Sequence, residues 1–236
     1  MPTRPLSSDL ASLAPDNLPE HLHEHLPVAQ AAAERNVAKA GAAVGARVHE
    51  LDEQAYAAVR MPAALPVRIT RLKFIAGQWS EALGAHAACR QGCSSCCHVA
   101  VSLSQAEARL IARKTGARLI EGPGAPLGFA DPKEVDRIAG TPCPFLAGGR
   151  CSIYAHRPFV CRTLVNMDDS SVLCEVVPGV NVPVPYANSV NQRGLFAAAT
   201  LKEPHADIRE WFGAEPLQPT ASPHIRPLEA PPPKDR

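Results

Sequence analysis

Cysteines at short spacings are the residues of this chain best suited to chemistry. The 236 residues contain eight cysteines, and seven of them fall into two groups. The first group is Cys89-x3-Cys93-x2-Cys96-Cys97, and the second is Cys143-x7-Cys151-x9-Cys161. A CxxC step brings two thiolates within reach of one ion, as in structural zinc sites and iron–sulfur proteins. The spacing therefore predicts metal binding by thiolates.

Core packing and disulfide bonding are the two other uses of cysteine. A buried cysteine behaves as a small hydrophobe, but packing gives no reason for four cysteines within residues 89–97 without a surrounding apolar run. Disulfides are typical of exported proteins. Residues 1–17 are interrupted by proline and lack the apolar core of a secretory signal. The sequence therefore predicts a cytoplasmic protein with reduced thiols.

The roles of four residues stay open. Cys96 and Cys97 are adjacent and are expected to point in different directions, so one of them serves a second centre or is a spare thiol. Cys174 stands alone in an apolar stretch (SVLCEVV), where burial explains it at least as well as ligation. His98 follows Cys97 directly, and an imidazole there can replace a thiolate ligand or tune the centre from outside.

The two cysteine groups and the residues between them resemble the YkgJ-like family of cysteine-cluster proteins. The resemblance covers about residues 85–165 and includes the pieces CPFL, CSIY and RPxxCR at positions 143–146, 151–154 and 157–162. That family is described as a zinc- or iron-chelating domain, without a settled activity. The resemblance implies seven candidate metal ligands: Cys89, Cys93, Cys96, Cys97, Cys143, Cys151 and Cys161.

All-cysteine coordination suits tetrahedral zinc and suits an iron–sulfur cluster about equally well. Seven clustered cysteines exceed the four of a single zinc site, which favours an iron–sulfur cluster. The predicted function is a metal chelator, carrier or metal-stapled interaction module. The alternative is a redox or other enzyme that uses the cysteine-bound centre, although no GxGxxG, P-loop or GxSxG motif accompanies the cysteines.

Composition restricts the partners other than metal. The net charge is +1 and only 5% of the residues are aromatic, so a nucleic-acid partner is not expected. The chain has no run of about eighteen apolar residues, so no membrane span is predicted. The sequence does not indicate a protein partner or an oligomeric state.

Apolar periodicity predicts a mainly α fold around a small irregular cysteine-rich centre, with a short β-hairpin. Helices are expected over 28–60, 67–88, 105–115, 131–138 and 190–202. Ser104 and Glu107 carry a capping-box signature, and Gly148-Gly149 marks a hairpin within 143–154. Pro158 is expected to open a short helix with Cys161 in its first turn, and Arg157 and Arg162 to offset the charge of the thiolates.

Three regions are predicted along the chain. Residues 1–27 form a flexible leader, in which His21, His23 and His25 are expected to be solvated. Residues 28–212 form a single helical domain with the cysteine-cluster core at 85–165. Residues 213–236 form a disordered proline-rich tail.

Overall fold

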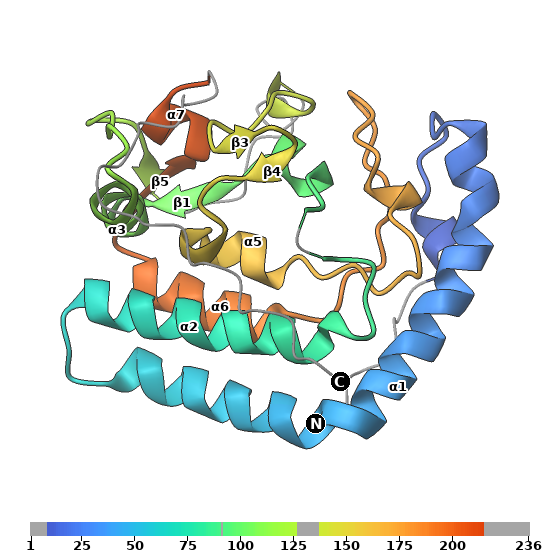
Figure 1. Cartoon of the computed structure of the whole chain (residues 1–236), viewed down its shortest axis with the longest axis horizontal. Coiled ribbons are helices and arrows are strands. Elements are labelled where there is room, and N and C mark those ends of the chain that lie inside the picture. The colour runs from blue at the N-terminus through green and yellow to red at the C-terminus, as the bar shows by residue number, and fades with distance from the viewer. Residues whose placement is uncertain (1–8, 91, 127–136, 215–236) are drawn as a thin grey trace, which may run out of the picture.

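The computed structural model describes residues 9–90, 92–126 and 137–214, and it is mainly helical with two small antiparallel sheets (Figure 1). This confirms the predicted fold class. The α-helices are α1 (Glu20–Arg60), α2 (Leu65–Gly84), α3 (Gln105–Thr115), α5 (Phe159–Thr163), α6 (Val190–Thr200) and α7 (Ile208–Phe212). The 3-10 turns are η1 (Leu10–Leu13), η2 (Ser95–His98), η3 (Tyr154–His156) and η4 (Val172–Cys174).

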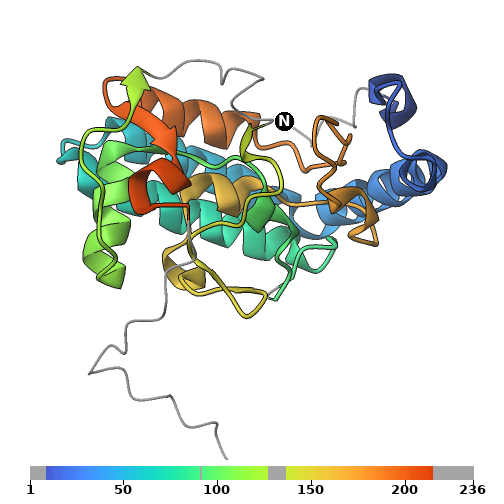
Figure 2. The ribbon, with the colours of Figure 1, turned by 90° about the horizontal axis from the view of Figure 1, so that it is seen from above.

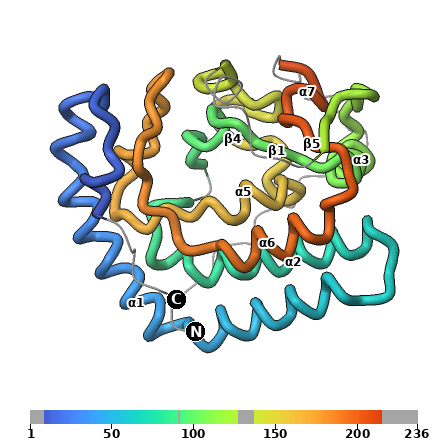
Figure 3. Tube along the Cα trace, turned by 180° about the vertical axis from the view of Figure 1, so that it is seen from behind, coloured from blue at the N-terminus to red at the C-terminus, as the bar shows by residue number. Residues whose placement is uncertain are grey.

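The two long helices form an antiparallel hairpin along one side of the molecule. Leu72, Ile75 and Trp79 of α2 pack against an alanine-rich face of α1 that includes Ala55 and Ala58, and all five are buried. Helices α5 and α6 cover the other side of α2 (Figures 1 and 3). The rings of Phe159 and Phe196 stack with centroids 4.1 Å apart and join these two short helices. The cysteine-bearing segments therefore lie on one side of this helical hairpin.

The N-terminal part of α1 extends beyond the hairpin and packs on a separate cluster (Figure 2). Leu22 and Leu26 are buried there with Leu10 of η1 and Leu173 of η4. The helix begins at Glu20 rather than at the predicted Val28, because leucines at i and i+4 continue its buried face through Pro27. The division into leader, domain and tail stays a prediction, and residues 1–8 and 215–236 lie outside the described part.

A three-stranded antiparallel sheet joins the cysteine region to the end of the described chain. Its order is β1 (Ser102–Ser104), β5 (Pro204–Asp207) and β2 (Ala125–Pro126). Leu103 pairs with Ala206, and the Trp211 indole of α7 donates to the Leu103 carbonyl at 3.2 Å. Strand β5 and helix α7 are not among the predicted elements, although Asp207 and Glu210 form a complete capping box at the start of α7.

Several predicted elements match the structure closely. Helix α3 has the predicted bounds and ends at Gly116 in the left-handed conformation. The predicted hairpin is the second sheet, β3 (Leu146–Ala147) paired with β4 (Arg150–Cys151), and Gly148 and Gly149 in its turn both have positive φ. Helix α2 stops four residues before the expected end at Ala88. Most of the predicted helix 131–138 lies outside the described residues.

The capping box at α3 is only half formed, and its acidic residue has a different task. The Ser104 hydroxyl accepts from the Glu107 N–H at 3.2 Å, as predicted. The Glu107 carboxylate instead accepts from the Phe159 N–H at 2.7 Å and lies 3.3 Å from Lys73 Nζ. Glu107 therefore joins α2, α3 and the first turn of α5.

We expect Glu107→Ala to lower the free energy of unfolding by about 3 kcal/mol, because it leaves a nearly buried lysine and the Phe159 N–H unpaired. Urea denaturation followed by circular dichroism measures this change. Glu121→Ala is the matched control, since its partner Arg109 and Glu121 itself are exposed, and it should cost less than about 0.5 kcal/mol. Equal losses in the two variants would contradict the assignment.

Candidate metal centre

Three separate segments bring cysteines to one place. The chain leaves helix α2 at Gly84, Cys89 and Cys93 follow it, and Cys96 and Cys97 lie in η2. The β3–β4 hairpin carries Cys151 and is preceded by Cys143, while α5 carries Cys161. All seven cysteines of the two sequence groups line a single cavity of about 580 Å³. Helix α2 also lines this cavity, with Phe74, Gly77, Gln78, Ser80, Glu81 and Gly84.

Arg209 of α7 fixes two of these segments. It is 6% exposed, and its guanidinium donates to the carbonyls of Cys97, Val99 and Thr141. The Asp207 carboxylate lies 3.0 Å from Arg209 Nη1 and accepts from the Val101 N–H at 2.7 Å. One buried ion pair therefore holds the backbone at the C-terminal end of the first cysteine group and just before Cys143.

The backbone of the two cysteine groups is also joined directly. The Cys143 N–H donates to the Cys97 carbonyl at 2.7 Å, and the Gly140 N–H donates to the His98 carbonyl at 2.9 Å. Cys97 and Cys143 are buried, and the other five cysteines that line the cavity are partly buried. Cys96 and Cys97 both line the cavity from their 3-10 turn.

The loop after α5 connects the cavity to Cys174. The Asn166 N–H donates to Cys89 Sγ at 3.2 Å, and the Asn166 side-chain amide donates to Cys174 Sγ at 3.3 Å. Cys89 Sγ in turn lies 3.6 Å from the Leu164 carbonyl. Cys174 does not line the main cavity; it lies with His98 and Glu175 on a shallower hollow. The eighth cysteine is therefore separated from Cys89 by one asparagine, a proximity that no sequence spacing reveals.

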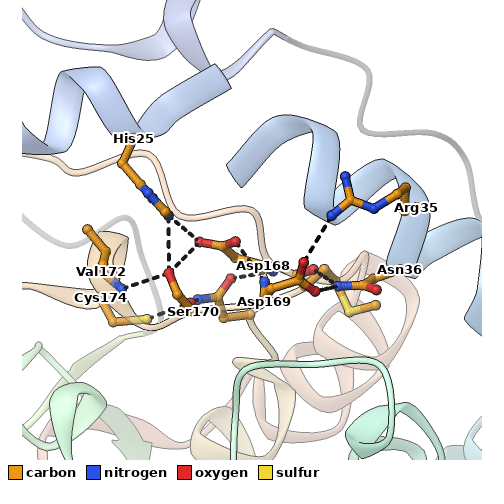
Figure 4. Close-up of polar contacts among 10 residues, drawn as sticks. His25, Arg35, Asn36, Asp168, Asp169, Ser170, Val172 and Cys174 are labelled. Carbon is orange, nitrogen blue, oxygen red and sulfur yellow. Dashed lines mark hydrogen bonds and ion pairs between the residues drawn. The ribbon is translucent and has the colours of Figure 1, made fainter. Parts of the chain in front are cut away.

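A polar network fastens this loop to helix α1 (Figure 4). The Asn36 amide donates to the Met167 carbonyl at 2.9 Å and to Asp169 Oδ1 at 2.8 Å. His25 Nε2 lies 2.9 Å from Asp168 Oδ2, and the Asp168 side chain is 1% exposed. The long helix α1 therefore supports the loop that hydrogen-bonds to Cys89.

His25 differs from the solvated residue that the sequence predicts, because it is half-buried against Asp168. His21 pairs with Glu175 on the surface and His23 is exposed. The Ser170 hydroxyl also contacts His25 Nε2, at 3.1 Å. Because Asp168 and Ser170 approach the same ring nitrogen, the three side chains do not form the relay of a nucleophilic triad, which uses both nitrogens.

Burial favours the protonated form of four thiols of the cavity. It raises the pKa of Cys143 to about 11 and raises the pKa of Cys161 well above its usual range. Burial likewise raises the pKa values of Cys89 and Cys151. The hydrogen bond with the Cys97 thiol, followed by burial, raises the pKa of Cys96. A metal that binds these sulfurs must displace their protons.

Two arginines lie beside the thiols, as the sequence predicts. Arg157 and Arg162 both line the cavity, and the positive charge of Arg157 acts against the rise in the Cys161 pKa. Burial lowers the pKa of Arg162, and the neighbouring Arg157 lowers it further. Pro158 is the N-cap residue of α5, which places Cys161 in the first turn.

Cysteine chemistry fits a thiophilic metal. Soft thiolate ligands select zinc and iron–sulfur clusters over hard ions such as magnesium and calcium. Among the residues that the structure describes, no three His, Cys, Asp or Glu side chains already form a group that could hold a metal ion. Within the same residues, no helix has the length and apolar character to cross a membrane.

Comparison with known protein families supports the cysteine chemistry. Residues 88–176 match the model of the CxxCxxCC family, described as a "Putative zinc- or iron-chelating domain". The match confirms that this segment is a domain of the cysteine-cluster type that its motifs resemble. It extends to Cys174 and includes the loop around Asn166. No curated protein and no solved structure matches the chain.

We expect Arg209→Lys to lower the free energy of unfolding by about 2 kcal/mol or more, since a single ammonium group cannot replace the planar fork that serves three carbonyls and Asp207. Thermal and urea denaturation of the protein as purified measure the loss. Arg118→Lys, at an exposed position of the same residue type, should change stability by less than about 0.5 kcal/mol. An Arg209→Lys variant as stable as the control would show that the ion pair is dispensable.

Proposed function

We propose that the protein binds an iron–sulfur cluster or zinc through cysteine thiolates of the cavity, and that it acts as a metal chelator, carrier or metal-stapled interaction module. The observation that carries this proposal is the convergence of seven thiols, from three segments, on one cavity. The zinc- or iron-chelating description of the matched domain supports it independently. The proposed ligands are drawn from Cys89, Cys93, Cys96, Cys97, Cys143, Cys151 and Cys161.

Between the two metals, the number of thiols and the size of the cavity favour the iron–sulfur cluster. A structural zinc site is a closed tetrahedron of four ligands with sulfur at about 2.3 Å. The seven cysteines line, together with other side chains, a cavity of about 580 Å³, which is more space than one such tetrahedron needs. A bound cluster would supply one-electron transfer, whereas bound zinc would supply a structural cross-link.

The residues around the thiols favour the binding of a negatively charged metal centre. The walls of the cavity reduce the contact of the sulfurs with water, and Arg157 and Arg162 supply two positive charges beside them. The Asn166 N–H donates to Cys89 Sγ, and hydrogen bonds of this kind to sulfur set the potential of an iron–sulfur centre. The reducing cytoplasm that the sequence predicts would keep unbound thiols reduced.

Anaerobic purification followed by metal analysis and a visible spectrum tests the proposal. We expect iron with inorganic sulfide and a broad visible absorption, and we expect Cys93→Ser to lose most of the bound metal together with ordered structure in residues 85–165. Ser94→Ala, a change of similar size at the next position of the same loop, should keep the metal. A colourless protein with stoichiometric zinc would show that the bound metal is zinc and not an iron–sulfur cluster. Folded wild-type protein free of metal would contradict both.

The raised thiol pKa values predict a strong pH dependence of metal affinity. Each thiol that binds as a thiolate releases one proton below its own pKa, and burial raises the pKa of Cys143 to about 11. Affinity should therefore rise about tenfold per pH unit for each such ligand near neutral pH. Competition of zinc between the protein and a chelating dye, at two pH values about one unit apart, measures the slope. Proton release into weak buffer gives the number of ligand thiols, and a slope of zero would exclude thiol ligands.

A further inference from the structure

We propose that the thiol cavity also binds a small organic carboxylate, held by the guanidinium of Arg157 beside the metal. This rests on the proposed function, because it places the carboxylate next to the thiolate-bound centre. The cavity of about 580 Å³ falls within the range of roughly 300–1,000 Å³ that is typical of small-molecule sites. Residues of α2 line the same cavity as the cysteines, and this volume leaves room for a second occupant beside the metal.

Arg157 has donors that the protein does not use. Its Nη2 donates to Ser80 Oγ at 3.3 Å, but its Nε is buried without a hydrogen-bond partner. Its guanidinium lies over the Tyr154 ring, 4.3 Å from the centroid, which fixes the plane of the group. No carboxylate of the described residues pairs with it. A buried donor without an acceptor is costly, so the geometry favours an acceptor from outside the chain.

The guanidinium of Arg162 donates to backbone carbonyls, whereas Nε of Arg157 has no acceptor. Its Nε donates to the Arg157 carbonyl at 3.1 Å, and its Nη2 donates to the Ala155 carbonyl at 2.7 Å. An added Cβ at Gly77 would lie 2.9 Å from Arg162 Nη1, so the glycine gives this side chain its space on α2. Arg162 therefore supports the turn that presents Arg157, and Arg157 is the group available to a ligand.

The charged residues that line the cavity favour an anion, and the remaining lining favours an organic one. Among the described residues, the charged side chains that line the cavity are three arginines and one glutamate: Arg90, Arg157, Arg162 and Glu81. The glutamate is exposed. A guanidinium matches a carboxylate through two parallel hydrogen bonds, as it cannot match a single sulfur. The α2 wall adds the half-buried Gln78, whose amide has no hydrogen-bond partner within the described ranges.

Apolar side chains complete the site. Phe74, Leu164 and Val165 line the cavity together with the polar groups. A small number of oriented polar groups on a largely apolar wall is the usual composition of a small-molecule site. The ligand class that fits is a small carboxylic acid. The rest of the ligand is apolar or carries a group that hydrogen-bonds to the Gln78 amide.

Saturation-transfer NMR on the metal-loaded protein tests this site, with benzoate, succinate and citrate as probes and benzamide as the uncharged comparison. We expect at least one carboxylate to bind and benzamide not to bind. Arg157→Gln should weaken carboxylate binding by about tenfold or more, because a charge-assisted pair of hydrogen bonds is lost. Arg118→Gln, an exposed arginine outside the cavity, should leave it unchanged.

Metal content and far-UV circular dichroism are measured on the same samples. Weakened carboxylate binding by the metal-loaded fraction of a folded Arg157→Gln variant supports the site, whereas unchanged carboxylate binding by that fraction overturns it. A second variant, Gly84→Leu, narrows the cavity from α2, where an added Cβ meets no atom within 4 Å, and should also weaken carboxylate binding. Absence of binding by all three carboxylates overturns the inference and leaves the metal proposal standing. A metal-free wild-type protein would instead contradict the proposed function.

Discussion

The buried Asp207–Arg209 pair is the interaction on which the cysteine centre depends. Loops rich in cysteine have little apolar surface to fix their conformation, so their carbonyl groups need donors from elsewhere. Arg209 supplies donors to Cys97, Val99 and Thr141, and Asp207 accepts from the Val101 N–H. Buried ion pairs are weak sources of stability when their desolvation is counted. The role of this pair is therefore to define one conformation of two loops.

A second layer of support comes from the helices. Glu107 joins α3 to Lys73 of α2 and to the first N–H of α5, so the helix that carries Cys161 has a fixed start. On the other side, Asn36 holds the Met167 carbonyl, and the neighbouring Asn166 hydrogen-bonds to Cys89. The thiols are thus positioned by polar groups on three long or medium helices, while the loops, the β3–β4 hairpin and α5 carry them.

Local signals in the sequence were enough to predict most of the helices other than α7, the hairpin and the set of cysteines that share a cavity. Helix α3 has its cap serine and its terminal glycine in the chain itself, and the Gly148-Gly149 pair determines its own turn. Strand β5 was missed because PHAD has no apolar alternation, and it is a strand only because β1 and β2 flank it. The task of Arg209 was equally unreadable, since its acceptors are backbone carbonyls that lie about seventy or more residues away. Contacts of this range leave no spacing pattern.

The hydrogen bonds from Arg209 to the backbone of the cysteine loops have a consequence for biosynthesis. The arginine lies 112 residues after Cys97, whose carbonyl it holds, and β5 and α7 are the last elements of the described chain. A chain still emerging from the ribosome presents all eight cysteines before it presents Arg209. Closing such long loops is slow compared with forming local helices. During synthesis there is therefore an interval in which all eight cysteines are present but their loops are not yet fixed. Oxidants or competing metals have access to the thiols throughout that interval.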